Sequence, residues 1–393
     1  MRFQVRRYDT AEPVAVEIDK GRLLRLESLS LSNAGGENPV VANDLPWLIP
    51  GLVDLQVNGY GGAEFGSPEI TVEQVRKVVE KMLDFGVTRF CPTVTTASAQ
   101  VIEHGLSTIA AACDRNPFVI RHVIGIHLEG PYISREDGPR GAHPLAHCRE
   151  PDWDEFQRFQ AAAAGWIRLL TLSPEYPGAV AFIRRATASG VVVSIGHTNA
   201  TGDQIRAAVD SGAKLSTHLG NGSHRSLRRH PNYLWDQLAE DRLSASLIVD
   251  GHHLPPEVVK TFVRAKGADR CILVSDLSGL AGLPPGQYGS GLCDLEILAD
   301  GRLVLAGQDQ LLAGASQPLL DGVENVMRFA GVDFRTAVAM ASVHPAQLLD
   351  LPTPSFTVGE EADYVLLSRK KENGAIRKVA HFTARGNQAG SEL

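Results

Sequence analysis

Between residues 50 and 351 the chain alternates short apolar segments with amphipathic ones. The apolar segments have no polar face, which is typical of strands in a parallel sheet that is covered by helices. Eight such segments are predicted as strands, at residues 52–57, 87–91, 123–128, 167–172, 191–195, 214–217, 245–249 and 272–275. Eight strands that alternate with helices predict an α/β fold, a (β/α)8 barrel of the TIM type.

The segments between the strands carry signals that begin and end helices. Thr71 and Thr201 are each followed three residues later by glutamine, which is a capping-box pattern. Gly86, Gly190 and Gly212 stand just before a predicted strand, where a left-handed glycine ends a helix. The alternative fold is an open, doubly wound sheet. Its dinucleotide-binding form needs G-x-G-x-x-G after the first strand, whereas residues 59–62 read Gly-Tyr-Gly-Gly.

The two ends of the chain differ from this central part. Residues 1–49 and 353–393 show short alternations of apolar and polar residues among turn residues, which is typical of small β-elements. We predict that both ends together form one small discontinuous β-sandwich domain, and that residues 50–352 form the barrel.

The composition argues against some classes of partner. The 38 Lys and Arg residues against 45 Asp and Glu give a net charge of −7, which does not favour nucleic acid or an anionic membrane. No apolar run approaches the roughly 18–20 residues that span a bilayer, and the N-terminus lacks the apolar segment of a secretory signal. The five cysteines form no C-x-x-C, so we expect reduced thiols in a cytoplasmic protein.

Polar side chains follow almost every predicted strand, at the end where a barrel of this type carries its active site. Carboxylates, imidazoles, amides and hydroxyls collect there: Gln56, Asn58, Thr93, Thr95, Glu129, Ser173, Glu175, His197, Asn199, His218, Asn221, Asp250, His252, His253 and Asp276. A barrel with only a structural role does not need such a ring. We therefore predict that these side chains converge on a site.

Glu129, His197 and His218 follow three different strands and could meet at one divalent ion. Two imidazoles and one carboxylate, with a fourth position left to water, are typical of a catalytic zinc site. Such an ion lowers the pKa of its water from about 15.7 to about 7, and Asp276 could accept the proton. Any one of these histidines alone is more simply a hydrogen-bonded, buried side chain, but the set together favours a metal site.

Seven motifs occur in order along the chain: PGLVDLQVNGYGG, HLEGPYI, RGAHP, VSIGHTNAT, STHLGNGS, IVDGHHL and LVSDLSG. Together they resemble the amidohydrolase superfamily and, within it, the N-acetylglucosamine-6-phosphate deacetylases. The resemblance covers about residues 50–365. It implies the same barrel with a β-domain, one metal ion on Glu129, His197 and His218, and Asp276 as the acid and base. The ion is expected to be zinc, with iron, manganese or cobalt as alternatives.

Many amidohydrolases carry His-x-His after the first strand and bind a second metal ion there. This chain has Gln56-x-Asn58, and amides are poor ligands beside imidazole, so we expect one ion. The resemblance also implies that His143 contacts the sugar or polarises the acetyl carbonyl. The residues expected at the substrate are Gln56, Asn58, Asn221, Gly222, Arg229 and His253.

The loop after His218 departs from the family pattern. The family usually reads THLFNAM and then R-x-PG, whereas this chain reads THLGNGS and then, from residue 228, RRHPN. Its three nearby arginines, Arg225, Arg228 and Arg229, are either an anion site or a solvated loop. One guanidinium group can donate two parallel hydrogen bonds to the oxygens of a phosphate, which favours the anion site. His127, by contrast, is expected to pack or to orient a neighbour.

The residues and the resemblance together predict a metal-dependent hydrolase of amino sugar metabolism. It would remove the N-acetyl group of N-acetylglucosamine 6-phosphate and release acetate and glucosamine 6-phosphate. The resemblance also implies a homodimer, in which part of the phosphate site could cross the interface. Two alternatives stay open: the same chemistry on a non-phosphorylated or different N-acyl amino sugar, and a non-catalytic sugar-binding homologue.

Overall fold

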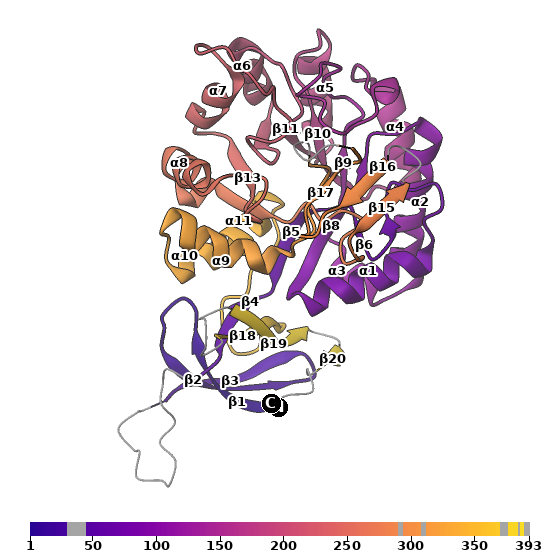
Figure 1. Ribbon diagram of the computed structural model, residues 1–393. Helices are drawn as coiled ribbons and strands as arrows, with labels where there is room; N and C mark the ends of the chain where they lie inside the picture. The colour runs from indigo at the N-terminus through magenta and orange to yellow at the C-terminus, as the bar shows by residue number, and fades with distance from the viewer. Residues whose placement is uncertain (30–44, 290–293, 308–311, 370–375, 384–385, 389–393) are drawn as a thin grey trace.

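A computed structural model describes residues 1–29, 45–289, 294–307, 312–369, 376–383 and 386–388. Its centre is a sheet of eight parallel strands in the order in which they occur in the chain (Figure 1). The strands are β5 (Leu52–Val57), β8 (Val87–Thr95), β9 (Ile126–Glu129), β10 (Ile167–Leu172), β11 (Val192–Ile195), β12 (Ala213–Ser216), β13 (Ser244–Ile248) and β14 (Cys271–Val274). The predicted eight strands are confirmed, with ends that differ by a few residues.

The sheet closes just beyond β14. The backbone N–H of Asp276 donates to the carbonyl of Gln56 at 3.0 Å, and the N–H of Asn58 donates to the carbonyl of Leu277 at 2.8 Å. These bonds join the last strand to the first, so the sheet is a barrel and not an open, doubly wound sheet. The carboxyl ends of all eight strands consequently point to one mouth.

Helices alternate with the strands as predicted. They are α1 (Val72–Asp84), α2 (Ala99–Arg115), α3 (Val119–His122), α4 (Trp153–Ala162), α5 (Ala179–Ala188), α6 (Gly202–Asp210), α7 (Tyr233–Ala239), α8 (Pro256–Lys266), α9 (Leu319–Ala330), α10 (Phe334–Ala341) and α11 (Val343–Leu348). Thr71 and Thr201 form the two capping boxes expected from the sequence. Gly86, Gly190 and Gly212 have φ angles of 79°, 86° and 108°, so each ends its helix in a conformation that favours glycine.

The two ends of the chain meet in one β-domain, which lies below the barrel in Figure 1. Its strands are β1 (Arg2–Arg7), β2 (Pro13–Asp19), β3 (Arg22–Ser28), β4 (Trp47–Pro50), β18 (Asp363–Arg369), β19 (Ile376–Thr383) and β20 (Gly386–Gln388). They form one seven-stranded sheet in the order β20-β19-β18-β4-β1-β2-β3, so a strand from the C-terminal end pairs with one that leads into the barrel. The division at residues 49/50 and 352/353 stays a prediction.

Two small sheets, which the sequence did not predict, lie near the mouth of the barrel. The hairpin β6 (Gly59–Tyr60) and β7 (Ala63–Glu64) follows the first barrel strand. The three strands β15 (Gly286–Gly289), β16 (Asp294–Ile297) and β17 (Leu303–Leu305) follow the last one. Leu295, Ile297 and Leu303 form a small core of their own beneath this second sheet.

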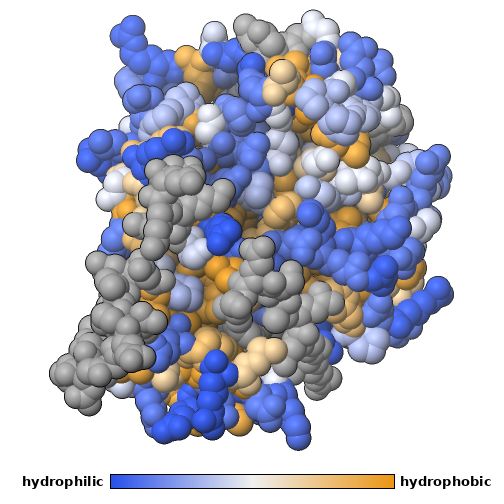
Figure 2. Space-filling view, turned by 60° about the horizontal axis from the view of Figure 1, so that its bottom comes forward, coloured by the Kyte–Doolittle hydropathy of each residue, from blue (hydrophilic) through white to orange (hydrophobic). Residues whose placement is uncertain are grey.

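The cysteines, the helix lengths and the surface can be compared with the composition. Cys91, Cys113, Cys148 and Cys271 are free and buried, as expected for structural thiols, and Cys293 lies outside the described residues. None of the helices in the described ranges has the length and apolar character needed to cross a bilayer. Figure 2 shows hydrophilic side chains interspersed with apolar ones on one face of the molecule.

Candidate active site

Three of the predicted ligands meet at the mouth of the barrel. Glu129 is the last residue of β9, and His197 and His218 each lie two residues beyond the end of a strand, β11 and β12 respectively. The Nε2 atoms of the two histidines are 3.2 Å apart, and they lie 3.2 Å and 2.9 Å from Oε1 of Glu129. All three side chains are buried. The sequence therefore predicted correctly that these residues come together.

These distances fit a shared metal ion. Four ligands placed tetrahedrally at about 2.1 Å from zinc lie about 3.4 Å from one another, close to the separations of the three atoms. Nδ1 of His197 lies 2.9 Å from the carbonyl oxygen of Pro139. Since a carbonyl only accepts, Nδ1 carries a proton, which leaves Nε2 as the nitrogen that would bind a metal ion.

The electrostatics of the cluster also suit a cation. Burial opposes ionisation of Glu129, but hydrogen bonds and charge interactions with His197 and His218 outweigh it and hold the pKa of the carboxyl well below its usual range. Burial disfavours the charged form of His218, yet the neighbouring Glu129 carboxylate raises its pKa overall. An ionised carboxylate with two imidazoles is a buried site that a positive charge stabilises.

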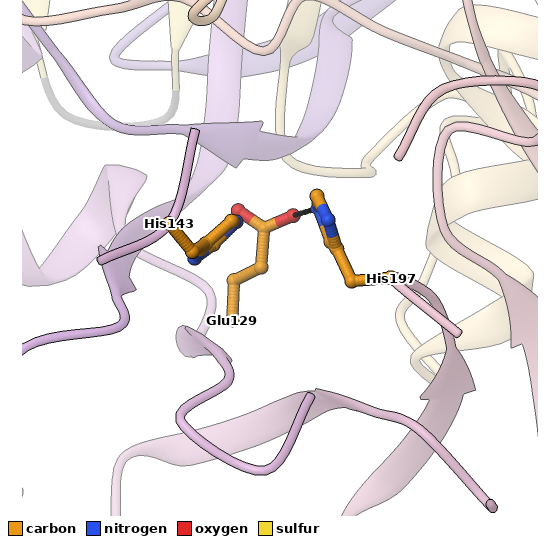
Figure 3. Close-up of side chains that lie close together, drawn as sticks. All are labelled: Glu129, His143 and His197. Carbon is orange, nitrogen blue, oxygen red and sulfur yellow. Dashed lines mark hydrogen bonds and ion pairs between the residues drawn. The ribbon is translucent and has the colours of Figure 1, made fainter. Parts of the chain in front are cut away.

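His143 is a fourth polar group at this point. Its ring centroid is 4.3 Å from that of His197, and a ligand atom from each of Glu129, His143 and His197 lies within 4.8 Å of the others. Figure 3 shows the carboxylate of Glu129 between the two rings. The set that contains His218 is the tighter one, since its atoms are at most 3.2 Å apart. Desolvation and the nearby His197 lower the pKa of His143 to about 3, so its ring is neutral at neutral pH.

Asp276 is held beside this cluster by two amides. Nε2 of Gln56 and Nδ2 of Asn58 both donate to its Oδ1, at 2.9 Å and 2.7 Å. Burial and the charge of Glu129 raise the pKa of Asp276 to about 6. A carboxyl group with a pKa near neutrality suits a group that must both accept and return a proton.

The backbone is strained where these side chains leave it. His197, His218 and Asp276 have φ angles of 49°, 26° and 54°, in a region that residues other than glycine rarely adopt. Such strain gathers at functional sites, where the surrounding fold enforces it. The turn after each strand therefore aims its side chain into the mouth of the barrel rather than along the strand.

A cavity of about 910 Å³ opens above these groups. Asn58, Glu129, His143, His197, His218, Asn221, Gly222, His253 and Asp276, all predicted at the site, line it. Gln56 contacts Asp276 and is not among the lining residues. Gly222 has no room for a side chain, because a Cβ atom there would lie 2.6 Å from Nδ1 of His197.

In the loop with three arginines, the arginine that lines the cavity is not the one that was expected at the substrate. Both Arg225 and Arg229 are exposed; Arg225 lines the cavity, whereas Arg229 is not among the residues that line it in the described part of the chain. The side-chain amide nitrogen of Asn221 is buried and has no hydrogen-bond partner among the described residues. A buried donor without a partner inside a cavity wall is a natural contact for a bound molecule.

Some site residues had no predicted role. Oδ2 of Asp250 lies 2.7 Å from Nδ1 of His253, and Oδ1 accepts the N–H groups of His252 and His253, so Asp250 fixes the position of His253. The position of Asp250 just after a barrel strand, β13, was the signal in the sequence that could have identified this role. Glu64 lines the cavity from the unpredicted hairpin, and no pattern in the sequence identified it.

His127 packs within the barrel, as expected. Its Nε2 lies 2.7 Å from the hydroxyl of Thr171, which in turn lies 2.7 Å from that of Thr217. Burial lowers its pKa to about 4, so the ring is neutral. This polar layer connects β9, β10 and the turn that carries His218 just below the candidate metal ligands.

The sequence pattern of the Amidohydrolase family matches residues 47–388. The chain belongs to the amidohydrolase family. A curated relative, N-acetylglucosamine-6-phosphate deacetylase of Bos taurus, is 36% identical over 333 residues, which cover 81% of this chain and 79% of that protein. N-acetylgalactosamine-6-phosphate deacetylase of Shewanella sp. (strain ANA-3) is 31% identical over 96% of this chain and 93% of its own length.

Solved structures of amidohydrolases agree with this assignment. The crystal structure of N-acetyl-D-glucosamine-6-phosphate deacetylase from Mycobacterium smegmatis superimposes with a TM-score of 0.84 at 28% identity and covers 98% of both chains. The similarity thus extends over the barrel and the β-domain together, which is the fold that the sequence predicted.

Proposed function

We propose that this amidohydrolase removes the acetyl group from the nitrogen of an N-acetylhexosamine 6-phosphate, with N-acetylglucosamine 6-phosphate as the first candidate. The observation that carries the proposal is the approach of Glu129, His197 and His218 to within 3.2 Å of one another beside Asp276, inside a large cavity. The names of the curated relatives supply the substrate class. The same four side chains argue against a non-catalytic homologue.

Glu129, His197 and His218 would hold one divalent ion, most simply zinc. When bound, that ion supplies Lewis acidity, which polarises the acetyl carbonyl and lowers the pKa of water. Asp276, fixed by Gln56 and Asn58, accepts the proton of the attacking water through its carboxylate. A new C–O bond forms at the acetyl carbon.

Collapse of the tetrahedral adduct breaks the C–N bond, and Asp276 returns the proton to the departing nitrogen. The products are acetate and the free amino sugar. His143, which is neutral, can donate a hydrogen bond to the acetyl oxygen as negative charge develops on it. His253 and the chain at Asn221 and Gly222 would hold the sugar.

Recognition of the phosphate is assigned to the arginine loop. Arg225 lines the cavity of its own chain, whereas Arg229 is exposed outside the lining, where it is available to a neighbouring subunit. We therefore propose a homodimer in which Arg229 completes the site of the neighbouring subunit. Separately, we propose that the protein is cytoplasmic. Guanidinium groups suit phosphate because they form two parallel hydrogen bonds with its oxygens.

The test is a comparison of substrates with purified protein supplied with zinc, iron or manganese. Acetate release should have the highest kcat/KM with N-acetylglucosamine 6-phosphate, and N-acetylglucosamine without phosphate should be a much poorer substrate. N-acetylgalactosamine 6-phosphate is the second candidate, because a relative that matches 96% of this chain is named for that sugar. A preparation that releases no acetate from any of the three sugars, with each metal, would refute the proposal.

A further inference from the structure

The hairpin of β6 and β7 brings a further carboxyl group, that of Glu64, to the wall of the cavity. Glu64 pairs in the hairpin with Gly59, the residue after Asn58, whose amide binds Asp276. The hairpin thus begins at the reaction centre. Glu64 has no part in metal binding or in the proton transfers described above.

The position of Glu64 is fixed by the segment that follows Asp276, at the end of the neighbouring strand β14. The N–H of Gly279 donates to its Oε2 at 2.7 Å, and the N–H of Gly62 donates to the carbonyl of Gly279 at 2.7 Å. The N–H of Gly61 donates to the carbonyl of Ala281 at 2.9 Å. The hairpin is therefore joined to the segment that follows Asp276, and the carboxyl group cannot easily swing away.

The close approach of these two segments needs glycine. A Cβ atom at Gly279 would lie 2.3 Å from Oε2 of Glu64 and 2.9 Å from the carbonyl oxygen of Ala63. A Cβ atom at Gly59 would lie 1.9 Å from that same carbonyl oxygen. Because both positions lack a side chain, one oxygen of Glu64 binds the backbone. The other oxygen, Oε1, has no hydrogen-bond partner among the described residues.

We propose that Glu64 binds a sugar hydroxyl next to the acetylated nitrogen, on C1 or C3, and so positions the ring for the reaction. The inference rests on the proposed function. In a 2-acetamido sugar the nitrogen that Asp276 protonates is on C2, so the hydroxyls on C1 and C3 flank it. The carboxyl groups of Glu64 and Asp276 line the same cavity, and the hairpin begins beside Asn58. The carboxyl group of Glu64, beside Asp276, would therefore contact the C1 or C3 hydroxyl rather than the phosphate on C6.

The ionisation of Glu64 agrees with this role. Burial, together with the charge of Asp276, raises its pKa to about 8. The group is then largely an uncharged acid at neutral pH, with one oxygen as acceptor for Gly279 and one O–H as donor. It can thus bind a hydroxyl without adding another negative charge to a site that already holds Glu129 and Asp276.

The experiment is a cycle of enzyme and substrate changes. Wild type, Glu64→Ala and Glu64→Gln are assayed with N-acetylglucosamine 6-phosphate and with its 1-deoxy and 3-deoxy analogues. Glu64→Ala should lower kcat/KM about tenfold to a hundredfold for the full substrate, which is the usual range for a hydrogen bond inside a site. For one of the two deoxy analogues, the variant and the wild type should react equally fast. Glu64→Gln, which keeps one acceptor and one donor, should recover most of the loss.

Two controls separate a direct contact from a structural effect. Glu103→Ala removes a carboxyl group on α2 that pairs with Arg158 and does not line the cavity, and it should leave kcat/KM unchanged. The ratio of the rates with N-acetylglucosamine 6-phosphate and its C4 epimer should be the same in Glu64→Ala as in wild type. If Glu64→Ala lowers kcat/KM by the same factor for the full substrate and both deoxy analogues, the inference is wrong. A wild type that is inactive on every sugar refutes instead the proposed function.

Discussion

Replacing Asp276 by asparagine isolates its role as a base. Both hydrogen bonds to Asp276 arrive at one oxygen, Oδ1, from Gln56 and Asn58. The amide oxygen of an asparagine can accept both of them, so the side chain should keep its position. What it loses is the capacity to take up a proton. General acid–base catalysis contributes about 10²–10⁴-fold, so we expect kcat to fall by that factor, or by about 3–5 kcal/mol of transition-state stabilisation.

The assay follows acetate release under single-turnover and steady-state conditions, with the metal content and the melting temperature measured on the same samples. KM, metal content and melting temperature should stay close to the wild-type values, because the fold and the ligands Glu129, His197 and His218 are unchanged. Asp152→Asn, in which the new residue can still cap α4, is the matched control and should not affect the rate.

The pH profile gives a second readout of the same variant. Asp276 works as a base only when ionised, and burial with the charge of Glu129 raises its pKa to about 6. A bound cation lowers this pKa, so kcat/KM of the wild type should fall as the pH drops through 6 or somewhat below. This acid limb should be missing from Asp276→Asn. The reasoning is refuted if the variant retains its metal and more than a tenth of the wild-type kcat.

Three further predictions address the metal, the barrel and the phosphate. Chelation should abolish acetate release and lower the melting temperature, and one equivalent of zinc per chain should restore both, because an ion that binds only the folded chain stabilises it; no change in melting temperature would count against the site. Burial raises the pKa of Asp54 from 3.8 to about 7. The protonated carboxyl therefore stabilises the fold fully below pH 3.8, and this effect is lost as the pH rises through 7. In urea titrations, the free energy of unfolding of the wild type should fall relative to that of Asp54→Asn by at most about 4 kcal/mol over this range. Parallel curves for the two proteins would contradict this. Arg225→Ala and Arg229→Ala should each lower kcat/KM about tenfold or more for the phosphorylated sugar and leave the plain sugar unaffected; equal losses on both sugars would exclude phosphate recognition.

The barrel and the approach of the three proposed metal ligands could be predicted because they depend on topology. Parallel strands place their carboxyl ends at one mouth, so Glu129, His197 and His218 had to meet once the strands were recognised. No detail of side-chain packing was needed for that step. The same reasoning placed Asp276 at this mouth, at the point where the last strand closes against the first.

The parts that the sequence did not reveal depend on irregular backbone. The strands of the β15–β17 sheet are three or four residues long, and two of the four residues of β15 are glycines, so no alternation of apolar residues marks this sheet. The direction of Arg225 and Arg229 follows from the path of a loop without regular structure, which spacing does not determine. Glu64 was missed for the same reason, because its hairpin consists of two-residue strands.

The amides Gln56 and Asn58 stand where many amidohydrolases are expected to carry two histidines, and this difference changes what the site can bind. A carboxylate can only accept hydrogen bonds, so the groups that face Oδ1 of Asp276 must be the N–H ends of both amides. A cation placed between these side chains and Asp276 would meet hydrogen-bond donors instead of lone pairs, which is unfavourable. Imidazoles at the same two positions could present lone pairs to such a cation. The two amides therefore favour a site with one ion, and they hold Asp276, the proposed acid and base, in the position that a second ion would otherwise have to fix.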